Sequence, residues 1–216
     1  MPLDVSITGA TGYLGRALTA ALHARGHRVS ALVRAGGAAR VAPGIAAHEV
    51  DVFDGAQLAA ALSGCNAVVH LVGTPNPNPR KAQEFERVDL GSARVCATAA
   101  ERAGVAHFIY VSVAQPAPVM QAYVAARQAA EDGIRETGLA ATFLRPWYVL
   151  GPGHRWPYLL LPFYAVARRL PGSRDVARRL GLVTLAQMTR ALVFAVENPP
   201  GARQVRIVDV PEIRAA

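Results

Sequence analysis

The sequence predicts a doubly wound, parallel α/β sheet followed by a small C-terminal cap. Short apolar runs alternate with longer segments whose apolar residues recur at helical spacing, which is typical of βαβ units and a parallel sheet. The chain has 216 residues, 52% of them hydrophobic, which suits one large domain with an ample core. We find no internal repeat and no low-complexity linker, so residues 1–216 are expected to form a single domain.

The elements follow one another as strand and helix along the first two thirds of the chain. Glycines stand where the expected helices end, as they do at left-handed helix termini. The expected strands are 4–8, 27–34, 48–51, 67–72, 107–112, 141–144 and 204–210. The expected helices are 13–25, one between an Asp54 cap and Gly64, 85–103, 123–137, and one that begins with a capping box of Thr184 and Gln187.

Residues 147–216 are expected to form a substrate or cap region packed on this domain. The regular alternation weakens after Arg145 and Pro146, and residues 155–190 hold seven arginines against one acid, Asp175. Aromatic residues accompany these arginines in 155–180. Three interpretations stay open for that segment: a lid over a substrate, a weak contact with an anionic membrane surface or a protein, and ordinary core packing.

A glycine-rich turn, TGATGYLG at 8–15, joins the first strand to the first helix. Gly9, Gly12 and Gly15 form a GxxGxxG pattern. Such glycines let a pyrophosphate approach the backbone closely, and the helix directs its positive N-terminal end at the phosphates. The turn therefore predicts a Rossmann-type domain that binds a dinucleotide. The alternative is a tight turn that binds nothing. It is disfavoured because the turn follows a strand and opens a helix.

The end of the second strand indicates NADP(H) in preference to NAD(H). NAD-binding folds place an acid there for the ribose hydroxyls, but this strand ends in Arg34 and has no acid between His27 and Ala47. A guanidinium can pair with the extra phosphate of NADP, which a carboxylate would repel. Arg16 could add a second contact, or both arginines could simply be exposed in an arginine-rich chain.

Further motifs resemble one superfamily. After TGATGYLG come ALVR at 31–34, Asp51-Val52, HLVG at 70–73 and LRPW at 144–147, in the order and at spacings of the atypical and extended short-chain dehydrogenases/reductases. The resemblance covers roughly residues 3–150. It is strongest to the NAD(P)H-binding branch that contains complex I accessory-subunit-like and sugar-epimerase-like proteins.

The resemblance implies a set of cofactor-binding residues. Asp51 and Val52 would lie beside the adenine, and Pro146 would approach the nicotinamide. With the glycine turn and the two arginines, the set is Gly9, Thr11, Gly12, Tyr13, Leu14, Gly15, Arg16, Arg34, Asp51, Val52, Leu71, Val72, Gly73 and Pro146.

The resemblance also implies a catalytic set, with one departure from the family pattern. Ser112 and Tyr123 fall at the positions of the catalytic hydroxyl residues, but the family's Tyr-x-x-x-Lys reads Tyr-x-x-x-Arg here, with Arg127 as the fourth residue after the tyrosine. The two side chains share one helix face. An arginine supplies positive charge and donors, but it does not readily pass on a proton, so weaker catalysis by the family mechanism is expected. Tyr123 could alternatively be a surface tyrosine of the helix.

Two functions follow as expectations. The first is an NADP(H)-dependent reductase or dehydrogenase that acts on a small, fairly apolar carbonyl or alcohol. The second is a non-catalytic NADP(H)-binding redox sensor or accessory protein. Scattered histidines predict no metal site, and no nucleic-acid-binding module is recognisable. Two cysteines and the lack of a signal peptide or an apolar span predict a cytoplasmic protein. No feature of the sequence indicates an oligomeric state.

Overall fold

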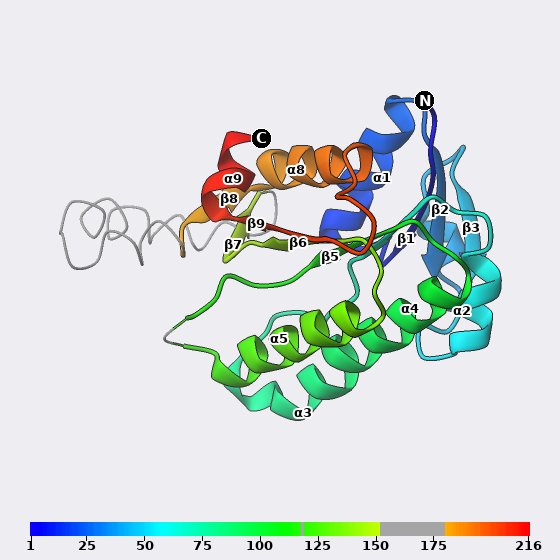
Figure 1. The fold of residues 1–216 in the computed structure, drawn as a ribbon. Coiled ribbons are helices and arrows are strands. Elements are labelled where there is room, and N and C mark those ends of the chain that lie inside the picture. The colour runs from blue at the N-terminus through cyan, green and yellow to red at the C-terminus, as the bar shows by residue number, and fades with distance from the viewer. Residues whose placement is uncertain (118, 152–179) are drawn as a thin grey trace.

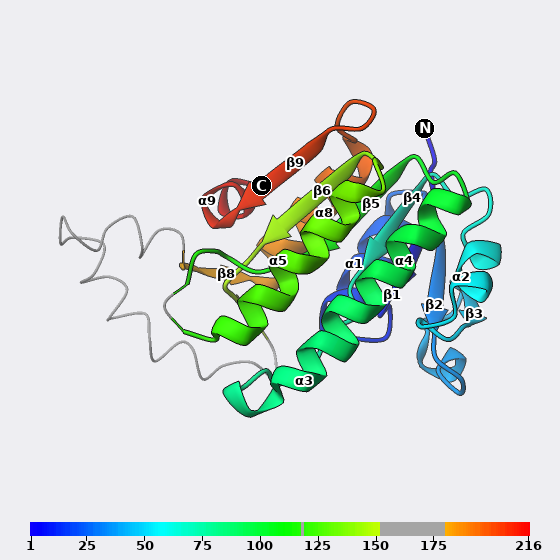
Figure 2. The ribbon, with the colours of Figure 1, turned by 60° about the horizontal axis from the view of Figure 1, so that its bottom comes forward.

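The computed structural model describes residues 1–117, 119–151 and 180–216. Within these residues seven strands form one parallel sheet in the order β3-β2-β1-β4-β5-β6-β9, which confirms the doubly wound fold (Figures 1 and 2). The order reverses between β1 and β4, and ligands of open α/β sheets bind at that point. The strands are β1 (Asp4–Thr8), β2 (Arg28–Val33), β3 (Ala46–Glu49), β4 (Ala67–His70), β5 (His107–Val111), β6 (Ala141–Arg145) and β9 (Val205–Asp209).

Helices cover both faces of the sheet. Figure 1 shows α1 (Tyr13–Ala24) and α8 (Leu185–Glu197) on one face, with α9 (Val210–Ala215) beside α8. The opposite face carries α2 (Gly55–Ala61), α4 (Gly91–Arg102) and α5 (Gln121–Glu136). All four residues of β4 are buried because helices lie on both sides of it. Each face has its own apolar cluster, around Leu18 and Leu22 of α1 on one side and around Phe108 and Phe143 on the other.

The long helix expected over 85–103 begins earlier and consists of three consecutive helical segments over 82–102. A short α3 (Ala82–Glu84) leads into a π-helical segment, η3 (Phe85–Leu90), and α4 follows. A π-helical turn rotates the side chains within it relative to an α-helix, and such turns are frequent at functional sites. In η3 the side chains of Phe85 and Asp89 are both fully buried.

Other elements also differ from the expected ones. The third strand lies at Ala46–Glu49 instead of 48–51, and all four of its residues are exposed, so apolar alternation could not place it. The last strand ends at Asp209, and Val210 begins α9 instead of closing the strand. Two short strands that were not expected, β7 (Tyr148–Leu150) and β8 (Leu182–Thr184), pair in a small parallel sheet.

The described parts of 147–216 are built into the domain. β9 extends the main sheet beside β6, and α8 packs on α1 through its buried side. The expected capping box at Thr184 and Gln187 is present: the Gln187 amide donates to Thr184 Oγ1, and Gln187 Oε1 accepts from the Thr184 amide. Across the described ranges, no helix combines the length and apolar character needed to cross a membrane.

Candidate cofactor and active site

The glycine turn forms a tight backbone loop at the start of α1. Gly9 has a φ of 71°, a left-handed conformation that favours glycine, and its carbonyl accepts from the Gly12 amide at 2.9 Å. A side chain at Gly15 would place its Cβ 2.3 Å from that carbonyl oxygen. Gly12 caps α1 without a side-chain hydrogen bond, so the first amides of the helix stay available to an anion. The turn has the geometry of a pyrophosphate site.

A cavity of about 870 Å³ lies on the β2 side of this turn. Arg34 borders it directly after β2, and Arg40, which the sequence reasoning missed, borders it from the short helical turn η1 (Ala38–Arg40). Within the described residues neither guanidinium has a hydrogen-bonding or ionic partner. Two unpaired cations at one rim suit a phosphate. Among the predicted cofactor residues, the cavity is lined by Gly9, Thr11, Gly12, Arg34, Asp51, Val52 and Val72.

Acidic residues on the β3 side of this cavity are already engaged with the backbone. Glu49 Oε1 accepts from the Gly36 amide at 2.9 Å, which ties β3 to the turn after Arg34. Asp51 Oδ1 accepts from the Phe53 amide at 3.0 Å, which leaves its second oxygen for a donor such as an adenine amino group. The cavity is therefore suited to an adenosine whose ribose end meets Arg34 and Arg40.

Arg16 lies apart from the other predicted cofactor residues. Its Nε donates to the Thr11 carbonyl at 3.0 Å, and its side chain borders a separate cavity of about 300 Å³ that Arg40 also lines. The hydroxyl of Thr19 in that cavity is buried and has no hydrogen-bond partner among the described residues.

A second cavity of about 550 Å³ lies on the other side of the glycine turn. Its walls are mostly apolar and aromatic, with Trp147 and Tyr148 following β6. The structure brings the predicted catalytic set together here with the remaining cofactor residues. The predicted residues that line it are Gly9, Gly12, Tyr13, Leu14, Gly15, Leu71, Gly73, Ser112, Tyr123, Arg127 and Pro146.

Ser112 lies directly after β5. Its amide donates to the Leu144 carbonyl at 2.7 Å, which fixes the backbone against β6. Its Oγ is buried and lacks a hydrogen-bond partner among the described residues. Because a buried hydroxyl is costly to leave unpaired, this atom suits a polar group of a bound molecule.

Tyr123 lies in the first turn of α5, half-buried at the cavity. Its ring packs edge-on against Phe85, with 5.0 Å between the ring centres. The Arg127 guanidinium lies over the face of the same ring, 5.2 Å from its centre. Two contacts on separate sides of the ring therefore hold this phenol in place.

Arg127 is buried and firmly held. Its Nη2 pairs with Asp89 Oδ1 at 2.6 Å, and its Nη1 donates to the Val111 carbonyl at 2.7 Å and to the Tyr110 hydroxyl at 3.2 Å. Burial acts to lower the pKa of Arg127, but the nearby Tyr110, Tyr123 and Asp89 outweigh it and raise the pKa above its ordinary value. Arg127 therefore stays charged. Burial raises the pKa of Tyr110 to about 12, so that phenol is neutral.

Asp89 lies on η3 and is the buried acid that pairs with Arg127. Its Oδ2 accepts from both the amide and the hydroxyl of Thr74, at 3.0 and 2.6 Å. A Cβ at Gly73 would lie 2.3 Å from Arg127 Nη2, so only glycine leaves room for the ion pair. The loop after β4, η3 and α5 thus meet at one buried charge pair.

Other predicted features lie outside the cavities or outside the described residues. His70 is a core histidine: its ring bonds to Thr8 Oγ1 at 2.9 Å and to Ser92 Oγ at 3.1 Å. Over the described ranges, no three His, Cys, Asp or Glu side chains gather where they could hold a metal ion. Nearly all of the arginine- and aromatic-rich segment 155–180 lies outside the described residues.

Comparisons with known proteins identify the family of this chain. A family model described as NAD(P)H-binding matches residues 9–155. The chain is 35% identical over 199 residues to a ceramide reductase of Caulobacter vibrioides, covering 90% of this chain and 57% of that protein. It is 27% identical to a 4-hydroxy-2-methyl-3-oxo-4-farnesyl-3,4-dihydroquinoline-1-oxide ketoreductase of Stigmatella aurantiaca, covering 94% of this chain and 67% of that protein.

A solved structure shares the fold. A short-chain dehydrogenase/reductase superfamily protein from Agrobacterium tumefaciens with bound NAD superposes with a TM-score of 0.69 at 18% identity, over 98% of this chain and 82% of that one. The chain spans little more than half the length of the ceramide reductase. The match over residues 9–155, together with the glycine turn and the sheet order, places this chain in the NAD(P)H-binding family.

Proposed function

We propose that this protein is an NADPH-dependent reductase of an apolar carbonyl compound. The observation that carries the proposal is the shared position of Ser112 and Tyr123, which line one cavity next to the glycine turn while Ser112 Oγ lacks a partner among the described residues. A carbonyl oxygen placed between two hydroxyls can accept a hydrogen bond from each.

The residues present fit the cofactor. The turn at Gly9–Gly15 and the uncapped start of α1 suit its pyrophosphate, and the cavity beyond β2 suits its adenosine. Arg34 and Arg40 favour a 2′-phosphate, which supports NADP(H) over NAD(H). When bound, NADPH supplies a hydride to the carbonyl carbon of the substrate.

The protein's own residues would then handle the proton. Tyr123 would donate its hydroxyl proton to the carbonyl oxygen, so that the carbonyl becomes an alcohol, and solvent would restore the proton to Tyr123. Ser112 would hold the same oxygen by a hydrogen bond. Arg127 would not relay the proton, because it stays charged and is bound by Asp89, Val111 and Tyr110. Its guanidinium would instead hold the ring of Tyr123 in place, 5.2 Å from the ring centre.

The apolar walls of the cavity favour an apolar substrate. Leu71, Val113, Trp147 and Val149 contribute aliphatic and aromatic surface, and Arg127, the single charged residue of the described lining, is already paired. The relatives named as a ceramide reductase and as a ketoreductase of a farnesyl-bearing dihydroquinoline oxide support the same class of substrate.

Turnover with a substrate panel tests the proposal. NADPH oxidation would be followed with an oxidised ceramide, a steroid ketone, a small aliphatic ketone and UDP-glucose. We expect turnover of an apolar ketone that is lost in Tyr123→Phe, and none of UDP-glucose. The Kd for NADPH should stay unchanged in Tyr123→Phe, which would show that the variant is folded and that its cofactor site is intact. Equal activity of the Tyr123→Phe variant and the wild type would exclude the assigned proton donor.

One observation favours a second candidate, a non-catalytic NADP(H)-binding protein. Arg127 replaces the lysine of the family pattern and is buried in contacts with the protein itself. Tight NADPH binding without turnover of any compound in the panel would support this candidate over the reductase.

A further inference from the structure

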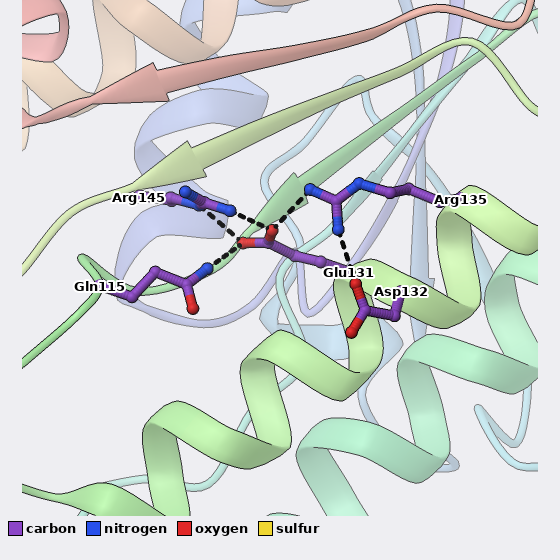
Figure 3. Close-up of polar contacts among 5 residues, drawn as sticks. All are labelled: Gln115, Glu131, Asp132, Arg135 and Arg145. Carbon is purple, nitrogen blue, oxygen red and sulfur yellow. Dashed lines mark hydrogen bonds and ion pairs between the residues drawn. The ribbon is translucent and has the colours of Figure 1, made fainter.

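The buried carboxylate of Glu131 joins three segments that surround the active-site cavity. Glu131 lies on α5, and its side chain is fully buried. Its Oε1 accepts from Gln115 Nε2 at 3.1 Å and from Arg145 Nε at 2.9 Å (Figure 3). Its Oε2 accepts closely from Arg145 Nη2, and from Arg135 Nη2 at 3.2 Å. Both carboxylate oxygens are thus occupied by donors from the loop after β5, from the end of β6 and from α5 itself.

Each partner lies a few residues from a group assigned to the site. Gln115 follows Ser112 by three residues in the loop after β5. Arg145 is the last residue of β6 and directly precedes Pro146, which lines the cavity. Glu131 itself follows Tyr123 by eight residues, two helical turns along the same face of α5. The carboxylate therefore connects the backbones that carry Ser112, Tyr123 and Pro146.

The chemistry of the contacts makes this connection stiff and directional. Arg145 presents both Nε and Nη2 to the carboxylate, the paired geometry that fixes orientation as well as distance. A buried carboxylate must keep such partners, because losing them leaves an unpaired charge in the protein interior. By contrast, Asp132, the next residue, is exposed, and Arg135 is its one ion-pair partner among the described residues, at 2.8 Å.

We propose that Glu131 is a positioning residue, which holds the loop after β5 and the end of β6 against α5 so that Ser112 and Pro146 keep their places relative to Tyr123. This inference rests on the proposed function for its catalytic consequence. A carboxylate that served stability alone would lower the unfolding temperature when replaced, but it would leave the turnover of the folded enzyme unchanged.

Glu131→Gln tests the proposal, because it keeps the size of the side chain and removes its charge. Asp132→Asn is the matched control, an equal change at the neighbouring position. Amide hydrogen exchange is measured first. We expect faster exchange in segments 112–117 and 145–148 of Glu131→Gln and unchanged exchange there in Asp132→Asn. Unchanged exchange in both segments of Glu131→Gln would overturn the proposal.

The kinetic readout separates positioning from stability. We expect Glu131→Gln to lower kcat by about 10- to 100-fold, the scale of a small misplacement of reacting groups, while the Kd for NADPH changes by less than about twofold. A folded variant with wild-type kcat would also overturn the proposal. If the wild type shows no turnover, the proposed reaction fails, and the exchange measurement still decides the role of Glu131.

Two milder variants guard against a Glu131→Gln protein that does not fold. Arg145→Lys keeps the charge and loses the paired geometry, and Gln115→Ala removes one neutral donor. We expect both to lower kcat, Arg145→Lys more strongly. Wild-type kcat in both would contradict the positioning role.

Discussion

The Asp89 carboxylate and the Arg127 guanidinium form a buried ion pair, with 2.6 Å between Oδ1 and Nη2. The pair joins the π-helical segment η3 to the helix that carries Tyr123. The Arg127 charge is balanced by this acid, and Gly73 leaves the space that the guanidinium occupies. The guanidinium is thereby fixed in place.

Replacement of Asp89 should destabilise the fold strongly. Asp89→Asn leaves the Arg127 charge buried without its counter-ion, and we expect a loss of about 3–5 kcal/mol in the free energy of unfolding. Urea denaturation measures it. The control Asp132→Asn breaks an exposed pair and should cost less than about 1 kcal/mol. Equal losses for the two variants would mean that the buried pair has no special role in stability.

Gly73→Ala should reduce turnover by displacing Arg127. The added Cβ would lie 2.3 Å from Arg127 Nη2 and 3.0 Å from Asp89 Oδ1, so the pair must shift. We expect kcat to fall by on the order of 100-fold, as for other small displacements of reacting groups. Gly55→Ala is the control, since its Cβ would meet its nearest neighbour, Val95, at an ordinary 3.7 Å. An alanine tolerated equally at both positions would argue against the need for space at Gly73.

Arg34 and Arg40 should determine the preference for NADPH. We expect Arg34→Ala and Arg40→Ala each to weaken NADPH binding by about 10- to 100-fold, the worth of a charge-assisted hydrogen bond, and to leave NADH binding nearly unchanged. Arg16→Ala should have a smaller effect, since Arg16 borders the adjoining cavity. Fluorescence titration gives the constants. If the affinities for NADPH and NADH fell by the same factor, the arginines would not contact the phosphate that only NADPH carries.

Stability should decrease as the pH falls below about 6.5. Burial, followed by the charge of Arg127, lowers the pKa of His70 to about 3, and burial with Arg206 lowers the pKa of His107 to about 4. An unfolded histidine titrates near 6.5, so between that pH and the folded pKa unfolding takes up protons. Each histidine therefore removes up to about 1.4 kcal/mol of stability per pH unit within its window.

The histidine contribution can be isolated by denaturation at several pH values. His107→Asn should flatten the dependence of the unfolding free energy on pH between about 4 and 6.5. An unchanged slope in His107→Asn would show that this residue does not titrate on unfolding.

The sequence predicts most of the sheet because buried parallel strands leave a strong apolar signal. β4 and β5 were recognisable in this way, whereas β3 is an exposed edge strand and was placed two residues late. The missed helix α9 did carry a signal. Asp209 and Glu212 form a capping box with a proline in the first turn, but the apolar residues before them favoured a longer strand.

The candidate site was predictable in its motifs and not in its contacts. The family resemblance assigned Ser112 and Tyr123 to one catalytic set, and the structure brings both residues to one cavity. The partner of Arg127 was not indicated, because Asp89 lies 38 residues earlier in the chain and reaches it only through a π-helical turn that apolar periodicity cannot distinguish from an α-helix. Arg40 was missed because it lies outside every recognised motif.

Titration of the purified protein with NADPH and with NADH, followed by cofactor fluorescence, tests the central claim most directly. The account predicts saturable NADPH binding that is at least about tenfold tighter than NADH binding, because Arg34 and Arg40 meet a phosphate that only NADPH carries. Equal or tighter binding of NADH would contradict the assignment of the two arginines. Binding of neither would show that the glycine turn does not hold a nicotinamide dinucleotide.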